Sequence, residues 1–293
     1  MNLIKNAFAH SGFFSKLILL LFFVFLGMFI AGAMVVIAQK LHWIDSQKTN
    51  YLLISQAITS LLMFIIPALI IAFLCSDNVT DFLFLKKKSQ FFEITAVIGI
   101  LIVGLPFINL LTSLNESLSK IPVFNELFSA TETNQRALAE KMITANFWGA
   151  MAVVALVAAV AEELMFRGAV LRILSEKINL HVAVWLSAAV FSLIHFQFFG
   201  FVPRMILGVY FAYIVIFSKN IRLSMLAHFF NNAAIIIVSH FSKNQSSTEV
   251  LDSVGTGGTW IVGIISGILA TFGTVYLIKY WKNQHDNQIL ITQ

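Results

Sequence analysis

Two glutamates and one arginine follow an apolar run and could form a chemical site. The run covers residues 147–160, and the charged residues Glu162, Glu163 and Arg167 lie in the segment AEELMFRG at 161–168. Charged side chains are costly in hydrocarbon, so ionisable residues inside a membrane segment indicate a functional site. A carboxylate in such a place is a candidate general base.

Helix geometry separates the two glutamates. Glu163 and Arg167 are four residues apart, so they share one helix face and can form an ion pair. Glu162 points about 100° away from its neighbour. We therefore expect Arg167 to neutralise Glu163 and to leave Glu162 free.

Two later apolar runs carry the polar residues that could meet Glu162. One contains Phe191 and His195, and the other contains His228 and Asn232. Members of each pair are four residues apart, so Phe191 can pack beside the His195 imidazole, and His228 and Asn232 share a face. A single histidine of this kind often does no more than join two membrane helices.

The depth of these residues favours a common site. Span ends on one side of the membrane lie near residues 175, 181 and 221. At 1.5 Å per residue, Glu162, His195, His228 and Asn232 lie roughly 10–21 Å from those ends. All four residues therefore fall in one band around the middle of a bilayer.

The composition of the chain predicts a membrane fold that would position these four residues. The chain has 293 residues, of which 59% are hydrophobic and 11% charged, with a mean hydropathy of +0.87. Soluble domains are about 25% charged, so we predict an all-α, polytopic membrane bundle. The net charge of +5 comes from basic residues at the ends of apolar runs, so no nucleic-acid partner is expected. The single Cys75 excludes an intrachain disulfide or a multi-cysteine metal site.

About eight transmembrane helices are expected in one integral membrane domain, residues 1–293. The candidate spans are 16–38, 51–75, 91–113, 146–174, 181–199, 203–218, 221–241 and 259–281. The sixth is the short one. The first exceeds the length of a signal-peptide core, so we expect it to be retained.

A polar connection over 114–145 separates the third and fourth spans. A short helix is expected to begin after Thr131. It could lie on the membrane as an amphipathic segment or be a solvated connector, which we favour. Lys and Arg are more frequent in the segments on the side of the N-terminus, which predicts a cell-membrane protein with both termini in the cytoplasm.

Three motifs in this order resemble those of the CAAX-protease and bacteriocin-processing family (CPBP, also called Abi) of intramembrane proteases. They are Glu162-Glu163-x-x-x-Arg167, Phe191-x-x-x-His195 and His228-x-x-x-Asn232. The resemblance covers about residues 145–240. It implies an endopeptidase in which Glu162 activates water for attack on a peptide carbonyl.

The same resemblance gives roles to the other motif residues. His228 and Asn232 would donate hydrogen bonds to the oxyanion, and His195 would orient the water or carry a proton to the leaving amine. Glu163, Arg167 and Phe191 would support the site. Arg167 could also hold a substrate carboxylate, although a structural role is favoured.

The site residues are compatible with two mechanisms, one with a zinc ion and one without a metal. Zinc could be held by Glu162, His195 and His228 with a free position for water. However, the sequence has no His-Glu-x-x-His motif and Asn is a poor zinc ligand. We therefore favour a glutamate-type mechanism with no metal or other cofactor.

Two other classes of function compete with a protease. Glu and His chains in membranes also form proton relays, but the sequence lacks the two related halves of a typical transporter. A non-catalytic immunity or scaffold protein is the second alternative. The expected partners of a protease are the lipid bilayer and a membrane-associated peptide or protein. The sequence does not distinguish a prenylated CAAX substrate from a bacteriocin-type peptide, nor does it give the oligomeric state.

Overall fold

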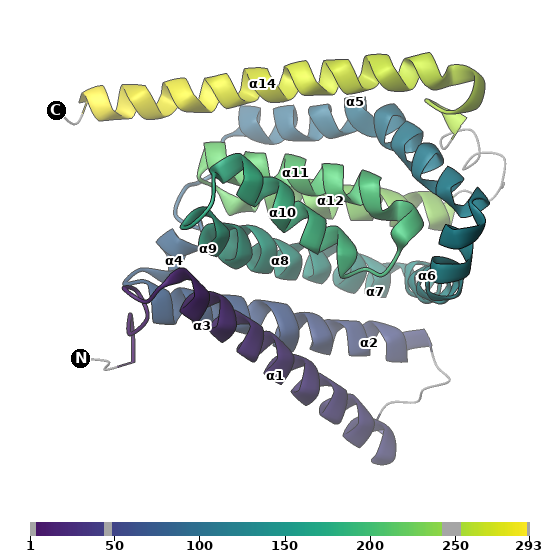
Figure 1. Cartoon of the computed structure of the whole chain (residues 1–293), viewed down its shortest axis with the longest axis horizontal. Coiled ribbons are helices and arrows are strands. Elements are labelled where there is room, and N and C mark those ends of the chain that lie inside the picture. Colours follow the sequence, from purple (N-terminus) through teal and green to yellow (C-terminus); the bar gives the residue numbers. More distant parts are fainter. Residues whose placement is uncertain (1–3, 44–48, 242–252, 292–293) are drawn as a thin grey trace.

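A computed structural model describes residues 4–43, 49–241 and 253–291, and within these ranges every regular element is a helix (Figure 1). The α-helices are α1 (Phe13–Lys40), α2 (Thr49–Thr59), α3 (Ile66–Cys75), α4 (Val79–Phe82), α5 (Phe91–Glu116), α6 (Pro122–Ile143), α7 (Phe147–Ala150), α8 (Ala158–Glu163), α9 (Leu171–Ser175), α10 (Leu180–Leu193), α11 (Phe201–Ser218), α12 (Ile221–Phe241) and α14 (Trp260–Ile291). The π-helical turns are η1 (Ser60–Ile65), η3 (Met151–Val157) and η4 (Leu164–Val170), and the 3₁₀ turns are η2 (Ser117–Lys120), η5 (Phe198–Gly200) and η6 (Gly257–Thr259). The predicted all-α fold is confirmed.

Seven helices in the described ranges are long and apolar enough to cross a membrane. The remaining apolar helix, α10, has only 14 residues. The prediction that the sixth span is the short one was wrong, because α10 ends at Leu193 and the chain then turns back. Phe196 takes a positive φ of 52° in this turn, and the sixth span begins at Phe198.

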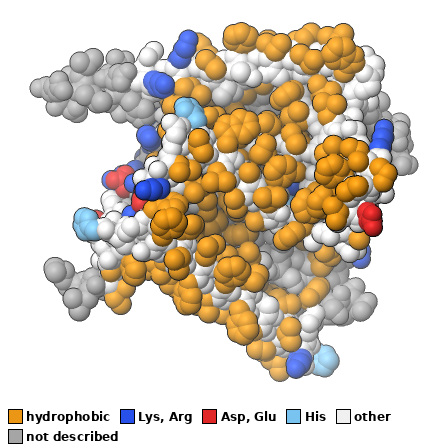
Figure 2. Space-filling model, in the orientation of Figure 1, with side chains coloured by type: hydrophobic (Ala, Val, Ile, Leu, Met, Phe, Trp, Pro, Cys, Tyr) orange, Lys and Arg blue, Asp and Glu red, His pale blue; other side chains and the backbone are white. Residues whose placement is uncertain are grey.

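The surface of the bundle matches a lipid environment. Figure 2 shows hydrophobic side chains across the middle of the molecule, with charged side chains towards the two ends of the helices. Among the exposed aromatic residues, Phe29 on α1 is 74% exposed and Phe272 on α14 is 70% exposed. Large exposed apolar surfaces mark contact with lipid or partners, so the chain is an integral membrane protein.

The fourth span (α7–η3–α8–η4–α9) lies in the interior of the bundle. It packs against α12, against η1 and α3, and against α10 and α11. The outer helices α1 and α14 flank this group on opposite sides, and α5 lies between α14 and the centre (Figure 1). The start of α1 and the end of α14 lie at the same end of the bundle.

The polar connection forms one long helix across the other end of the bundle (Figure 1). Helix α6 begins at Pro122 rather than after Thr131, because proline is well suited to the first helical turn. Val123 and Leu127 on this helix are each more than 60% exposed. Apolar exposure on a helix at the end of a membrane bundle favours the surface-bound alternative over the solvated connector.

Gly27 allows α1 to approach η1 closely. A Cβ at position 27 would lie 1.9 Å from the backbone oxygen of Leu62, whereas a Cβ at Gly32 on the same helix would meet no atom within 4 Å. We expect Gly27→Ala to destabilise the fold by about 1–3 kcal/mol. Gly32→Ala should be neutral or stabilise it by up to about 1 kcal/mol. Thermal unfolding in detergent measures both, and equal effects would contradict this close packing.

Candidate functional site

The two glutamates end a short α-helical stretch between two π-helical turns. Glu162 and Glu163 are the last residues of α8, with η3 before them and η4 after them. A π-turn widens the helix by one residue and often occurs at functional sites. The widened turns therefore set the directions in which the two carboxylates leave the fourth span.

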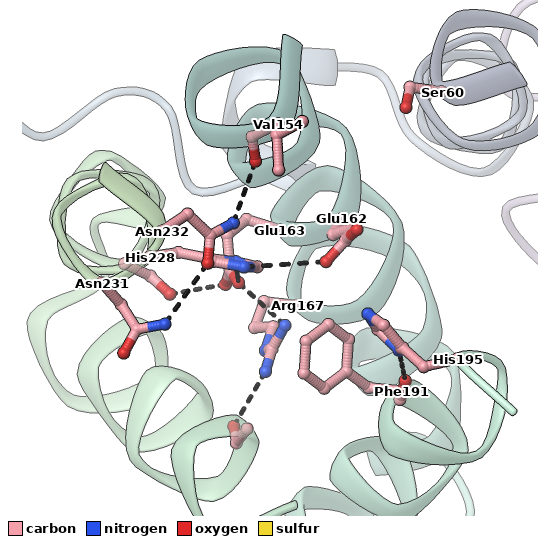
Figure 3. A network of polar contacts seen from close by, with 12 residues as sticks. Ser60, Val154, Glu162, Glu163, Arg167, Phe191, His195, His228, Asn231 and Asn232 are labelled. Carbon is pink, nitrogen blue, oxygen red and sulfur yellow. Dashed lines mark hydrogen bonds and ion pairs between the residues drawn. The ribbon is translucent and has the colours of Figure 1, made fainter. Parts of the chain in front are cut away.

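Glu163 accepts hydrogen bonds from three side chains (Figure 3). Its Oε1 accepts from Arg167 Nη1 at 2.8 Å and from His228 Nδ1 at 2.9 Å. Its Oε2 accepts from the Ser224 hydroxyl. Glu163 has no exposed surface. The predicted ion pair with Arg167 is present, and α12 contributes two further donors.

The buried Arg167 guanidinium has hydrogen-bond acceptors and aromatic neighbours within the protein. Besides Glu163, it bonds the backbone oxygen of Gly208 on α11 through Nη2 at 3.0 Å. Its guanidinium lies 4.5 Å from the ring centroid of Phe191 and 5.5 Å from that of Phe211. Both terminal nitrogens are used and the side chain is 1% exposed. This environment favours the structural role over binding of a substrate carboxylate.

His228 lies between the two glutamates. Its Nδ1 faces Glu163, and its Nε2 is 3.6 Å from Glu162 Oε2, which is longer than a hydrogen bond. Its ring stacks on Phe211. As the partner of Arg167 in an ion pair, the Glu163 carboxylate can only accept hydrogen bonds, which assigns the proton to Nδ1 of His228. His228 can then donate from Nε2 only in its doubly protonated form.

Glu162 is left without a hydrogen-bond partner in the described part of the chain. The side chain is 8% exposed, and the basic group nearest to it is the His228 imidazole, at 3.6 Å. The carboxylate points into the space beside His228 and His195 rather than towards Glu163 (Figure 3). A buried carboxylate with free acceptor positions has room to accept a proton from a bound water.

His195 approaches this space from the end of α10. Its Nδ1 donates to the backbone oxygen of Phe191 at 2.9 Å, because a carbonyl oxygen can only accept. The second ring nitrogen is turned towards Glu162 (Figure 3). The predicted packing against Phe191 is present, with the rings edge-to-face at 5.2 Å. In its neutral form His195 therefore presents an acceptor nitrogen to the site.

Asn232 joins α12 to the fourth span. Its amide nitrogen donates to the backbone oxygen of Val154 at 3.1 Å, and its Oδ1 accepts from Asn231 at 3.3 Å. One N–H of Asn232 is therefore committed to Val154. Its second N–H could donate a hydrogen bond to the oxyanion, which is the role that the family resemblance implies.

Sequence reasoning missed three partners of the network: Ser224 and the backbone oxygens of Gly208 and Val154. Ser224 precedes His228 by four residues, so the same helix-face rule would have found it. The two backbone acceptors have no sequence signal, because any residue type supplies a carbonyl.

The arrangement of His, Cys, Asp and Glu side chains bears on metal binding. Within residues 4–43, 49–241 and 253–291, no three His, Cys, Asp or Glu side chains are grouped so that they could hold a metal. The zinc ligands considered from the sequence were Glu162, His195 and His228. These three side chains do not form such a group in the structure.

The fold and the site together define a polytopic membrane protein with an acid–histidine centre inside its helical bundle. Residues 144–234 match the family described as type II CAAX prenyl endopeptidase Rce1-like. This match confirms, over residues 144–234, the CAAX-protease and bacteriocin-processing family expected from the three motifs. Neither a curated protein nor a solved structure matches the chain.

Proposed function

We propose that the protein is a glutamate-type intramembrane endopeptidase that hydrolyses a peptide bond in a membrane-associated substrate. The observation that carries this proposal is the free Glu162 carboxylate, buried beside His195 and 3.6 Å from His228. The neighbouring Glu163 is held by three donors. One carboxylate is thus available for chemistry and the other organises the site.

In the proposed first step, water adds to the substrate carbonyl carbon. Glu162 takes one proton from the water as the new carbon–oxygen bond forms. The negative charge moves to the carbonyl oxygen, which accepts hydrogen bonds from Nε2–H of His228 in its doubly protonated form and from the second N–H of Asn232. The Val154 bond holds the Asn232 amide in place for this task.

In the second step, the tetrahedral intermediate collapses and the carbon–nitrogen bond breaks. The leaving nitrogen needs a proton, which comes from the protonated Glu162 directly or through the Nε2 of His195. The products are a carboxylic acid and an amine. The hydrogen bond from His195 Nδ1 to Phe191 fixes the ring so that Nε2 faces the reacting groups.

The proposed substrate is a peptide or protein held at the bilayer. We place the protein in the cell membrane with both termini in the cytoplasm, because basic residues are more frequent on that side. Prenylated CAAX proteins and bacteriocin-type peptides are the two candidate substrate classes. A non-catalytic immunity or scaffold protein is the alternative function.

Purified protein and membrane-tethered peptides test the proposal. The protein is reconstituted in detergent or vesicles with prenylated and non-prenylated peptides of the same sequence, and mass spectrometry identifies the products. We expect two fragments whose masses sum to the peptide plus one water. Intact peptides throughout, with a folded protein, would support the non-catalytic alternative.

Metal independence is a separate expectation. Cleavage should change by less than about twofold after treatment with a strong chelator, because the proposed base acts on water without a Lewis acid. The rate of product formation before and after chelation, and after zinc is returned, measures this. Loss of activity on chelation and recovery with zinc would assign the reaction to a zinc-bound water instead.

A further inference from the structure

His195 lies in the turn after α10 rather than on a regular helix. Helix α10 ends at Leu193, and the backbone N–H of His195 bonds the Ser192 oxygen at 3.3 Å in the turn that follows. Phe196 has a positive φ of 52°, a conformation that costs a bulky residue free energy. The place of the imidazole therefore depends on what holds residues 194–202, here called the His195 turn.

The backbone polar groups of the His195 turn need partners in the protein, because the turn lies within a membrane bundle. Ser192 provides one of them, since its hydroxyl donates to the backbone oxygen of Phe201 at 2.8 Å. This bond joins the last turn of α10 to the first residue of α11. The residues between these two points are held by side chains from other helices.

Asn115, in the last turn of α5, bonds the His195 turn at two places. Its Oδ1 accepts from the backbone N–H of Val202 at 2.7 Å, and its Nδ2 donates to the backbone oxygen of Phe198 at 3.0 Å. The side chain is 4% exposed. A single buried amide thus fixes η5 and the start of α11 relative to the third span.

Glu132 on α6 bonds the middle of the same turn. Its Oε2 accepts from the backbone N–H of Phe199 at 3.2 Å. Its Oε1 accepts from Arg136 at 2.6 Å, four residues further along the same helix. Glu132 is buried and Arg136 is exposed. The ion pair therefore holds the carboxylate in the direction in which it meets the turn.

Apolar packing alone does not fix this part of the chain. A pocket of about 200 Å³ lies between the end of α5, α6 and the start of α11. Phe128, Leu193 and Phe198 are among the residues that line it. Side chains that face a void lack contact atoms on that side. The hydrogen bonds from α5 and α6 therefore carry much of the restraint on the His195 turn.

We propose that Asn115 and Glu132 are positioning residues, which hold the His195 turn so that the imidazole Nε2 faces the proposed general base. This inference rests on the proposed function. Both residues belong to the polar connection between the third and fourth spans, outside the stretch that matches the family. The connection thereby has a role in the reaction, which it exerts through the place of the imidazole and without contact with the substrate.

Loss of the two Asn115 bonds should be seen in kcat. We expect Asn115→Leu to lower kcat by about tenfold to a hundredfold, because a small displacement of a reacting group slows the chemical step. KM should stay close to that of wild type. Thr112→Ala is the matched control and should leave both constants unchanged, since the Thr112 hydroxyl bonds the Ile108 oxygen within α5.

Glu132 allows a conservative replacement to be compared with a disruptive one. Glu132→Gln keeps an oxygen that can accept from the N–H of Phe199, so it should retain most of kcat. Glu132→Leu removes the acceptor and should lower kcat, by less than Asn115→Leu because one bond to the turn is lost instead of two. Equal kcat in the Gln and Leu variants would overturn the role of Glu132.

A double-variant cycle separates positioning from general damage to the fold. In a His195→Ala background, Asn115→Leu should change kcat by less than about twofold, because the group through which it acts is already absent. The same fractional loss of kcat in both backgrounds would overturn the inference.

Nitrogen NMR of histidine-labelled protein in detergent gives a measurement without cleavage. At a pH at which the ring is neutral, the bond to Phe191 should give His195 one protonated and one unprotonated nitrogen. His195→Ala assigns these signals. Asn115→Leu should shift or broaden them, and Thr112→Ala should not.

Thermal unfolding verifies that each variant is folded, and Glu132→Leu carries the NMR test if Asn115→Leu is not. Unchanged His195 signals in the folded variants would overturn the inference, whether or not the protein cleaves peptides. Failure of wild type to cleave any peptide would instead count against the proposed function.

Discussion

Replacement of Glu162 by Gln is expected to lower kcat for peptide cleavage by about 10²–10⁴-fold, the usual contribution of a general base. Gln has nearly the same shape but cannot take the proton from water. In the described structure the Glu162 carboxylate makes no hydrogen bond, and its contact with His228 is 3.6 Å. The unfolding temperature should therefore change little, and KM should stay close to that of wild type.

Glu93 provides a matched control. It is also a buried glutamate in the membrane bundle, but it caps α5 and bonds Lys87 and Trp281. Glu93→Gln should reduce thermal stability and leave the activity per folded molecule near that of wild type. Full cleavage by the Glu162→Gln variant would show that the base is another residue. An equal loss of activity in both variants would indicate a general effect of removing a buried carboxylate.

The largest effect on stability is expected at the pair of Glu163 and Arg167. Arg167→Met leaves a buried carboxylate with only Ser224 and His228 as donors, and loss of one member of a buried ion pair costs about 3–5 kcal/mol. Glu163→Gln keeps an amide oxygen that can accept from Arg167, but it removes the opposing charge and leaves the guanidinium as a buried, unpaired cation. Thermal or denaturant unfolding in detergent measures both.

The double variant distinguishes the ion pair from simple packing. With both charges removed, the loss of stability should be smaller than the sum of the two single losses, since the double variant contains no unpaired buried charge. Activity per folded molecule should still fall, because Glu163 also fixes Nδ1 of His228. Additive losses would mean that the two side chains contribute independently, through their volume alone.

Local spacing predicted the parts of the site that lie on one helix. The ion pair of Glu163 with Arg167 and the packing of Phe191 on His195 are present as expected from the four-residue interval. The common membrane depth also predicted that His228 would reach Glu162. These inferences succeeded because helix rise and pitch are nearly constant.

Contacts made by the backbone and by turns could not be predicted in this way. The early end of α10 depends on the positive φ of Phe196, for which the apolar sequence gives no signal. The bond from Asn232 to Val154 depends on how α12 packs against the fourth span.

The polar network of the site is complete within a continuous part of the chain. Its members range from Val154 to Asn232, inside the 144–234 stretch that matches the family. Among the described side chains, helices α1 and α14 contribute none to it. Sequence change in these outer helices would thus leave the proposed reacting groups in place, so the fold can be adapted to bilayers of different thickness or to new lipid neighbours.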